Sequence, residues 1–548
     1  LDNGEVLEYT YTYKSDYEDV IDKVMLPSGK QSSIQTDVFG RLTSRTVNTS
    51  VPMSDTYTYK ANGSYTTPLV EKETLTCGNL SEEYRYTYDA NNNVTQIRNA
   101  AGELLVSYEY DGLNRLIRED VAGVDTTLYV YDKSGNIQSK NIFDYKEAEG
   151  RSVSELLNYT PRNQMTYGYN IAVNDDLLSS YNGSESLWYD DCGMPLVWFK
   201  HGEKSSCLRY LLQWSRLRLT RITDMETGKI YLYTYNDEGI RTEKVIDGIR
   251  HKYYLQGEQI IAEKIGDKYI KYYYDGTGIC GFNYDGTDYY YQKNIFGDIL
   301  KIYDGNGKVY GEYGYTAWGK CRIKTNINGI GEINPFRYRG YYYDEEISLY
   351  YLNARYYDPE IGRFISADRM EYLSPESING LNAYIYCGDN PVMNMDPSGC
   401  AWWEFWKWDW AKIGMIAVSV VEVAAGIAAI VLSQGAATEI GIGLIGTGVG
   451  SIMSGYINEA AGGKFAAGWH GGQVAGLVAT FIPISSMGSA LGGFVGSVVT
   501  DIFNHKKIDW GNAVLSGVIS GLFGKISGTF TGVIRELGKE ITGQLVNG

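Results

Sequence analysis

The sequence predicts a mainly β fold built from stacked hairpins, followed by an α-helical, glycine-rich tail. Tyrosine is unusually frequent, with 50 residues, and 49 of them lie before residue 401. Strand-like phrases that end in Tyr-Asp or Tyr-Asn recur before that point, whereas long apolar runs with glycines at four-residue spacing follow it. Residues 1–400 and the tail are therefore two different kinds of polypeptide.

Length and charge limit the architectures and the binding partners that the chain can have. The 548 residues exceed the size at which one hydrophobic core keeps growing, which favours several domains or a repeat architecture. The net charge is −17, and most of it lies in residues 1–400. Because an acidic surface repels nucleic acid, we expect no nucleic-acid partner. The seven cysteines are widely spaced without a CxxC pair, so neither a zinc site nor a disulfide framework is indicated. We expect no metal and no cofactor.

A repeated phrase, in which aromatic residues alternate with polar ones, runs through residues 1–333. Its clearest copies end at Asp89, Asp111 and Asp132, so these aspartates lie 22 and 21 residues apart. Alternation places the tyrosine rings on one face of a strand, and the Asp, Asn and Gly residues that follow favour a turn. Each unit is therefore predicted to be a β-hairpin in one continuous sheet. Since a buried tyrosine hydroxyl needs a partner, we expect a large polar or amphipathic interior.

A long segment after the repeats resembles the core signature of RHS repeat-associated proteins. Residues 334–368 read NPFRYRGYYYDEEISLYYLNARYYDPEIGRFISAD, and residues 381–391 and 396–399 resemble the end of that signature. Together with the repeats, the resemblance covers residues 1–399 and identifies the chain as a member of the RHS/YD-repeat family. It implies a spiral of β-hairpins that forms a hollow shell, residues 1–333, closed by a core-associated plug, residues 334–399. In this family a variable C-terminal domain, usually a toxin, follows the plug.

The resemblance also implies an autoprotease in the plug. In many relatives two aspartates share a proton, and the plug cuts after an Asp-Pro-x-Gly-Leu motif. The matching positions here are Asp368 and Asp396, with Gly399 and Cys400 at the candidate cleavage site. Two positions depart from the pattern, because Arg369 replaces proline and Cys400 replaces leucine. In the alternative, both aspartates only cap turns. Cys400 is not expected to act as a nucleophile, because no histidine lies near it in the sequence.

The tail begins with a tryptophan-rich linker, residues 400–412, and continues as an apolar region, residues 413–548. The linker holds six aromatic residues between positions 402 and 410, a density typical of membrane interfaces and equally suited to packing against the shell wall. Residues 413–432 are long enough to span a membrane as a helix. A charge at the centre of such a helix costs roughly 3 kcal/mol, so Glu422 is either functional or evidence against spanning.

Glycines at four-residue spacing are the second feature of the tail. This spacing clears a groove along one helix face, so that another helix can approach closely, as in glycine zippers. In water each such glycine costs a helix roughly 1 kcal/mol, which favours a bilayer or an oligomer. A soluble helical hairpin and a flexible linker are the alternatives. The glycines expected to pack helices together are Gly472, Gly476, Gly488, Gly492, Gly496, Gly517, Gly521, Gly524, Gly528 and Gly532.

These features predict a secreted or cell-surface toxin whose shell encapsulates and delivers a membrane-inserting, pore-forming tail. The expected partners are a target-cell membrane, a cognate immunity protein and a delivery apparatus. No enzymatic site is expected in the tail, because His470 and His505 lie beside no cysteine or carboxylate cluster. One alternative is a cell-surface or wall-associated interaction protein with a membrane-anchoring tail. The other is a toxin shell that lacks its downstream catalytic domain.

Overall fold

The structure is a computed structural model that describes residues 1–2, 4–14, 17–62, 65–169, 174–199, 210–369, 380–400 and 403–404. The chain divides into one compact unit of residues 1–12 and 22–408 and a second of residues 13–21 and 409–548. All strands from β3 to β35 lie in the first unit. The predicted tail helices, Glu422 and the glycine spacing of the tail lie outside the described residues.

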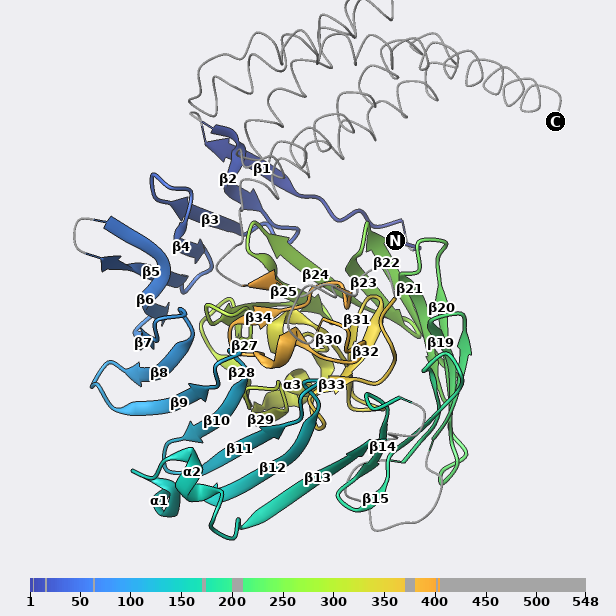
Figure 1. Cartoon of the computed structure of the whole chain (residues 1–548). Coiled ribbons are helices and arrows are strands. Elements are labelled where there is room, and N and C mark those ends of the chain that lie inside the picture. The colour runs from blue at the N-terminus through green and yellow to red at the C-terminus, as the bar shows by residue number, and fades with distance from the viewer. Residues whose placement is uncertain are drawn as a thin grey trace, which may run out of the picture. The chain divides into compact units, whose positions relative to one another are not determined.

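Two large antiparallel sheets follow the chain strictly in order (Figure 1). The 15-stranded sheet contains β1 (Thr10–Lys14), β2 (Tyr17–Met25), β3 (Gln31–Thr36), β4 (Leu42–Val47), β5 (Met53–Asn62), β6 (Tyr65–Cys77), β7 (Leu80–Tyr88), β8 (Val94–Asn99), β9 (Leu104–Tyr110), β10 (Leu116–Val121), β11 (Asp125–Tyr131), β12 (Ile137–Asp144), β13 (Asn163–Tyr169), β14 (Leu178–Tyr181) and β15 (Ser184–Glu185). Two short helices, α1 (Tyr145–Ala148) and α2 (Val153–Leu156), lie between β12 and β13.

The 14-stranded sheet contains β16 (Leu187–Tyr189), β17 (Pro195–Trp198), β18 (Tyr210–Ser215), β19 (Arg218–Asp224), β20 (Ile230–Tyr235), β21 (Arg241–Ile246), β22 (Ile249–Gln256), β23 (Gln259–Ile265), β24 (Lys268–Asp275), β25 (Gly278–Tyr284), β26 (Thr287–Lys293), β27 (Ile299–Asp304), β28 (Val309–Tyr315) and β29 (Cys321–Asn326). After it come η1 (Ile327–Gly329) and α3 (Ile330–Ile333). The mainly β prediction is therefore confirmed, with each strand paired to its neighbours in the sequence.

The expected continuous sheet is interrupted once, at Ser186. The N–H of this residue donates to the carbonyl of Ser179 in the first sheet (2.9 Å), and its own carbonyl accepts from Phe199, just beyond β17 of the second sheet (2.8 Å). Ser186 is fully buried. The main-chain hydrogen bonds thus switch partners at a single residue, which divides the predicted sheet into two.

Each Tyr-Asp phrase ends a strand at a turn that the aspartate closes. In the turn after β11, Asp132 Oδ1 accepts from the N–H groups of Ser134 (2.8 Å) and Asn136 (2.9 Å). Gly135 has a φ of 83°, in the left-handed region that glycine adopts without strain. This side-chain pattern recurs at Asp37, Asp89, Asp111, Asp190 and Asp304. The predicted turn chemistry is confirmed at these positions.

Many of the tyrosines that precede a turn donate their hydroxyl to the main chain of an earlier strand. Tyr131 donates to the carbonyl of Leu116 (2.6 Å), and Tyr110 donates to that of Val94 (2.9 Å). The same contact is made by Tyr59, Tyr169, Tyr235, Tyr274 and Tyr315. The repeat therefore provides main-chain acceptors for many of its inward hydroxyls, so tyrosine can take the place of Val or Leu at these positions of a packed interior.

Removing one of these hydroxyls is expected to have a modest effect. The substitution Tyr131→Phe leaves the Leu116 carbonyl without this donor and should lower the free energy of unfolding by about 1 kcal/mol. Chemical unfolding followed by tryptophan fluorescence measures it. Tyr159→Phe is the matched control, because Tyr159 is exposed. Equal losses in the two variants would contradict a role for the hydroxyl.

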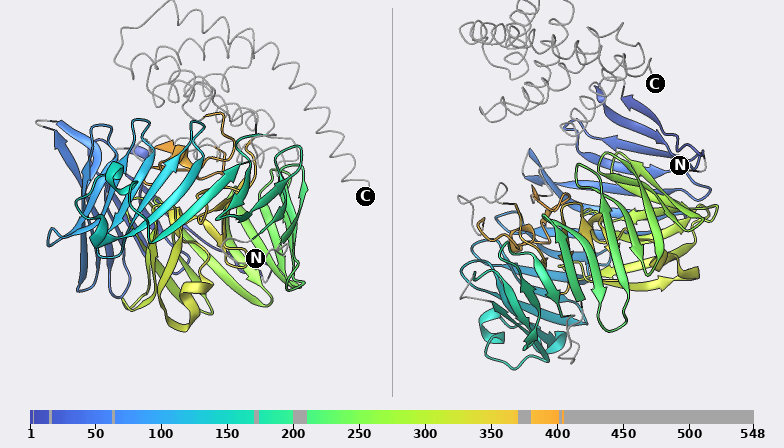
Figure 2. Two further views of the ribbon diagram at one scale, coloured as in Figure 1. Left: turned by 60° about the horizontal axis from the view of Figure 1, so that its bottom comes forward. Right: turned by 90° about the vertical axis from the view of Figure 1, so that its right-hand side faces the viewer.

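A third segment, the predicted plug, lies within the curve of the two sheets (Figures 1 and 2). It contains η2 (Tyr338–Gly340), a four-stranded sheet of β30 (Tyr342–Asp344), β31 (Leu349–Leu352), β32 (Arg355–Asp358) and β33 (Arg363–Phe364), η4 (Cys387–Asp389) and β34 (Asn394–Met395). The last of these strands pairs with β35 (Trp403–Glu404), which lies in the predicted linker. We call residues 334–399 the cap.

The cap contacts the inner faces of both sheets. On the first sheet, Lys140 donates to the carbonyl of Glu360. On the second, the carboxylate of Asp344 pairs with Arg241 (2.6 Å). Tyr357 donates to the carbonyl of Trp318, in the turn before β29 (2.7 Å). The interior next to the cap is thus filled by aromatic rings and buried ion pairs, which refines the expected polar or amphipathic interior.

Candidate functional site

Three parts of the cap converge on one buried arginine. Arg355 begins β32, Asp368 follows β33, and Asp396 follows β34. The Ala383 carbonyl accepts from the Asp368 N–H (2.9 Å) and from Arg355 Nη1 (2.9 Å). The Asp396 N–H donates to the Tyr341 hydroxyl (2.9 Å). These contacts fix the main chain at Asp368 and Asp396 and the end of the Arg355 side chain.

Arg355 pairs with both aspartates through the same nitrogen. Its Nη2 lies 2.8 Å from Asp368 Oδ2 and 3.5 Å from Asp396 Oδ2. The guanidinium carbon lies 3.6 Å from the centroid of the Phe364 ring, so the cation is also packed on an aromatic face. Because all three charged groups are at most 9% exposed, these contacts are electrostatically strong.

The same cluster holds the peptide bond between Gly399 and Cys400. Asp396 Oδ1 accepts from the N–H groups of Gly399 (2.8 Å) and Cys400 (3.1 Å). Arg355 Nε donates to the Gly399 carbonyl oxygen. The peptide lies in the hairpin loop between β34 and β35. A carboxylate thus faces its N–H side and a guanidinium polarises its carbonyl.

Gly399 can only be glycine at this position. Its φ of +73° lies in the left-handed region, and a Cβ would stand 2.4 Å from the Leu352 carbonyl oxygen and 3.0 Å from Arg355 N. Both obstructing atoms belong to the main chain of β31 and β32 and cannot move aside. The loop is therefore pressed against the cap sheet, with its carbonyl directed at the arginine.

Burial shifts the protonation of this cluster. It raises the pKa of Asp368 to about 6, with a smaller upward contribution from the charge of Asp396, while Arg355 opposes both. Burial and the charge of Asp368 raise the pKa of the Cys400 thiol to about 11. Near neutral pH, Asp368 can therefore both take up and release a proton, whereas Cys400 is a neutral thiol.

The structure brings together all four residues that the sequence pointed to in the plug, namely Asp368, Asp396, Gly399 and Cys400. Both aspartates also shape the local main chain, as the turn-capping alternative expects, since Asp396 accepts from Gly399 and Asp368 Oδ1 accepts from the Arg369 N–H (2.7 Å).

Arg355 was missed by sequence reasoning. Its place inside the signature, in Asn353-Ala354-Arg355-Tyr356, was the available signal. An arginine enclosed by aromatic strand residues needs a buried counter-charge, and the aspartates of the same signature can supply one.

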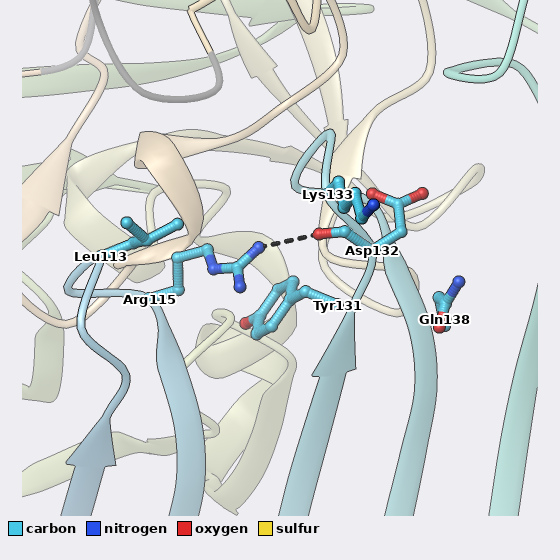
Figure 3. A pocket seen from close by; sticks show the side chains of 6 residues that line it. All are labelled: Leu113, Arg115, Tyr131, Asp132, Lys133 and Gln138. Atoms are coloured by element: carbon cyan, nitrogen blue, oxygen red, sulfur yellow. Dashed lines mark hydrogen bonds between the residues drawn. The ribbon is translucent and has the colours of Figure 1, made fainter.

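A separate shallow cavity of about 510 Å³ opens at the turns of the first sheet. Figure 3 shows its lining residues, Leu113, Arg115, Tyr131, Asp132, Lys133 and Gln138. The Arg115 guanidinium donates to the Asp132 carbonyl (3.0 Å), pairs with Asp111 (2.7 Å) and stacks over the Tyr131 ring (4.7 Å). Through these contacts Arg115 links neighbouring turns of the sheet. This favours a structural role for the residues that line the cavity.

Two further results concern only the described ranges. Among those residues, no three His, Cys, Asp or Glu side chains are grouped so as to hold a metal ion. Within the same ranges, no helix is both long enough and apolar enough to cross a membrane.

Known proteins share the repeats and the cap. The family model described as Teneurin YD-shell matches residues 261–392, and the model described as RHS Repeat matches residues 88–125. The tRNA3(Ser)-specific nuclease WapA of Bacillus spizizenii is 32% identical over 306 residues, which are 55% of this chain and 12% of that protein. Toxin subunit YenC2 of Yersinia entomophaga is 24% identical over 388 residues, covering 58% of this chain and 37% of that protein. The chain therefore spans only a part of these relatives' length.

A solved structure has the same fold. The crystal structure of TcdB2-TccC3-Cdc42 superposes with a TM-score of 0.52 and 17% identity, covering 72% of this chain and 22% of that chain. The two ordered antiparallel sheets and the enclosed cap define a YD-repeat β-shell protein. With both repeat models matched, the chain belongs to the RHS/YD-repeat family.

Proposed function

We propose that this chain is the shell and cap of a secreted or cell-surface toxin, whose shell holds and delivers the tail that follows. The relatives that share the shell include a nuclease and a toxin subunit, and both are much longer than the matched region. A shell common to proteins with different activities suits a container better than an active domain. A cognate immunity protein and a delivery apparatus are the partners that this role requires.

We further propose that the cap cuts its own chain between Gly399 and Cys400, one bond before the position that the motif of the relatives implies, and so releases the tail. One observation carries this proposal. Asp368 and Asp396 converge on Arg355, and the same arginine polarises the Gly399 carbonyl at the junction between cap and tail. An acid/base pair, a polarised carbonyl and a fixed peptide are the components that amide hydrolysis needs.

The contacts suggest a division of roles. Asp396 holds the two N–H groups of the peptide, so it orients the bond to be cut. Arg355 Nε donates to the oxygen on which negative charge develops during attack. Asp368, whose pKa of about 6 allows it to gain and lose a proton near neutral pH, takes the proton from the attacking group and passes it to the leaving nitrogen. A guanidinium between the carboxylates thus takes the place of the proton that the family resemblance implies they share.

The pH dependence tests this assignment. As a base Asp368 must start ionised, so the rate of cleavage should rise as the pH passes upward through about 6 and then level off. The first-order appearance of the 1–399 fragment, followed by electrophoresis and mass spectrometry, measures it. In Asp368→Asn the rise should disappear together with most of the cleavage. A rate that falls through pH 6 would contradict the assignment.

For the tail we propose insertion into a target-cell membrane, with the apolar runs and glycine spacing of residues 413–548 as support. The full chain should release dye from liposomes only after cleavage. The Asp396→Asn variant, which is expected to stay uncut, is the matched control. Leakage of equal extent from both proteins would separate membrane action from cleavage, and no leakage from the cut chain at any pH would refute the pore.

In a second candidate function, the shell encloses and delivers an enzyme, because the relative WapA is a tRNA nuclease. In that case the shell and cap keep their roles, and the expectation of no nucleic-acid partner fails. Incubating the cut chain with total tRNA distinguishes the candidates. Degradation would favour the nuclease, whereas intact tRNA together with liposome leakage would favour the membrane-active tail.

A further inference from the structure

We propose that two buried glutamates, Glu119 and Glu73, act as a proton-sensitive clasp between the two large sheets. The clasp holds turns of the second sheet against the first sheet while the carboxyl groups are protonated, and it loosens when they ionise. The inference goes beyond the proposed function, because it concerns the condition under which the shell loosens and not what the shell holds or how the chain is cut.

The first support is the position of Glu119 between the two sheets. Glu119 lies on β10 of the first sheet and is 4% exposed. Its Oε1 accepts from the N–H of Ala317, in the turn between β28 and β29 of the second sheet (2.7 Å). Its Oε2 accepts from the hydroxyl of Tyr129, on β11 (3.0 Å). A carboxyl group of the first sheet therefore binds the main chain of the second sheet directly.

The turn that Glu119 binds, residues 316–319, is also enclosed by the cap. The carbonyls of its last three residues each accept from the hydroxyl of a cap tyrosine, in the order Tyr338 (3.0 Å), Tyr357 (2.7 Å) and Tyr350 (3.0 Å). The ring of Trp318, which is 1% exposed, lies 5.8 Å from that of Tyr129 between ring centroids. Since one turn contacts both the first sheet and the cap, a change at Glu119 affects the packing of all three.

The second support is that Glu73 repeats this arrangement. Glu73 lies on β6, is fully buried and accepts from the hydroxyl of Tyr86, on β7 (2.7 Å). The Tyr86 ring packs edge-on against Phe296, with 5.9 Å between the centroids. Phe296 lies in the turn between β26 and β27 of the second sheet. A glutamate, a tyrosine on the next strand and an aromatic residue of a second-sheet turn thus occur together twice.

The third support is the surroundings of the two carboxyl groups. In the described part of the chain, no lysine, arginine or histidine forms an ion pair with either glutamate. The titratable groups that face Glu119 are Tyr108, Tyr110, Asp125, Tyr129 and Lys140. Those that face Glu73 are Asp55, Tyr57, Tyr84, Tyr86, Tyr88 and Asp298. A buried carboxylate without a cationic partner is costly, so both groups favour the protonated form.

Protonation therefore strengthens the clasp. Burial raises the pKa of Glu119 to about 7, although hydrogen bonds from Ala317 and Tyr129 oppose the shift, and burial raises the pKa of Glu73 well above its usual value. For a carboxyl group with a raised folded pKa, the contribution to stability is complete below the unfolded value of 4.5 and is lost as the pH rises through the folded value. The two sheets are thus held together more tightly in acid than at neutral or alkaline pH.

Hydrogen exchange of the full chain between pH 5 and 8, followed by mass spectrometry of the peptide that covers residues 316–319, tests the clasp. The substitution Glu119→Gln imitates the protonated carboxyl group, because its amide oxygen can still accept from Ala317. At pH 5 the native and variant turns should exchange equally. At pH 8 the native turn should open about 10²-fold more often, since each pKa unit is a factor of ten. Tyr129→Phe removes a hydrogen bond that favours the charged form, so it should move this pH dependence to higher pH.

The matched control is Glu263→Gln. Glu263 also accepts from a tyrosine of the next strand, Tyr272 (3.0 Å), but it pairs with His251 (2.6 Å). Although burial opposes it, the contacts with His251 bring the pKa of Glu263 below its usual value. This substitution should therefore speed the exchange of β22 and β23 at pH 8, the opposite sign.

Equal exchange of the native and Glu119→Gln turns at pH 8, or faster exchange of the variant, would overturn the clasp. An effect of the same size at pH 5 and pH 8 would also overturn it, because a purely structural contact does not depend on protonation. Near-ultraviolet circular dichroism confirms that each variant is folded. Tyr129→Phe keeps the glutamate itself, so an unshifted pH dependence in that variant refutes the clasp even if Glu119→Gln does not fold.

Discussion

Replacing Asp344 with asparagine should lower the free energy of unfolding by roughly 3–5 kcal/mol, because it removes the counter-charge of two buried cations. Arg241 Nη1 and Nη2 lie 2.6 and 3.1 Å from the Asp344 carboxylate oxygens, and Lys244 Nζ lies 2.8 Å from it. Arg241 and Asp344 are fully buried, and Lys244 keeps only Glu346 (3.1 Å) after the change. The ion pair joins β21 of the second sheet to β30, so its loss should loosen the cap.

Aromatic rings strengthen this cluster. The Arg241 guanidinium lies 4.2 Å from the centroid of the Tyr351 ring and 5.1 Å from that of Tyr342. Although burial raises the pKa of Asp344, the charges of Arg241 and Lys244 bring it below its usual value. The pair therefore stabilises the fold above the pKa of an unfolded aspartate, and this contribution is lost as the pH falls through the lower folded value.

Chemical unfolding at pH 7, followed by tryptophan fluorescence, measures the effect of Asp344→Asn. The matched control is Asp285→Asn, because Asp285 pairs with Lys268 at 3.4 Å on the surface, with the two side chains 71% and 58% exposed. An exposed pair contributes at most about 1 kcal/mol. Comparable losses in the two variants would show that the buried cluster does not anchor the cap.

The substitution Asp396→Asn should slow self-cleavage by about 10²- to 10³-fold, the usual cost of removing one electrostatic contact to the charge that develops in the transition state. The amide keeps an oxygen that can still accept from the Gly399 and Cys400 N–H groups, so the loop should stay folded. What it loses is the negative charge that balances Arg355 and the protonated leaving group. The rate at which the 1–399 fragment appears measures the effect.

Asp389→Asn is the control for this variant. Asp389 is another buried aspartate of the cap, and burial raises its pKa well above the usual value, which favours its uncharged form. Its amide analogue should therefore cut at the native rate. A native rate in Asp396→Asn, or an equal loss in both variants, would refute a chemical role for Asp396.

The hairpins could be predicted because their causes are local. Alternating tyrosines and the turns closed by Asp89, Asp111 and Asp132 involve atoms only a few residues apart. The interruption of the sheet at Ser186 had no such signal. It depends on the hydrogen-bond partners of this residue, which are the carbonyl of Ser179 in the first sheet and the N–H of Phe199 just beyond β17. The partners of the tyrosine hydroxyls lie in earlier strands, so the sequence showed that they were needed but not which atoms they were.

In the candidate site, the aspartates were found through the signature and the arginine was not. Asp368 and Asp396 are 28 positions apart in the sequence, and the residue that unites them, Arg355, lies on a different strand from both.

The sequence by itself determined the repeat and the turn chemistry, because both follow from short-range pattern, whereas the bounds of the cap and the residues of the cap–tail junction stay predictions from a contiguous signature. Only the tertiary structure decided how the cap is held, through Asp344 and Arg241, and that one guanidinium binds two carboxylates and the Gly399 carbonyl. A buried charge must be paired with an opposite charge or a hydrogen-bond partner. In this protein those partners lie on other strands, and packing over the whole fold decides which strands meet.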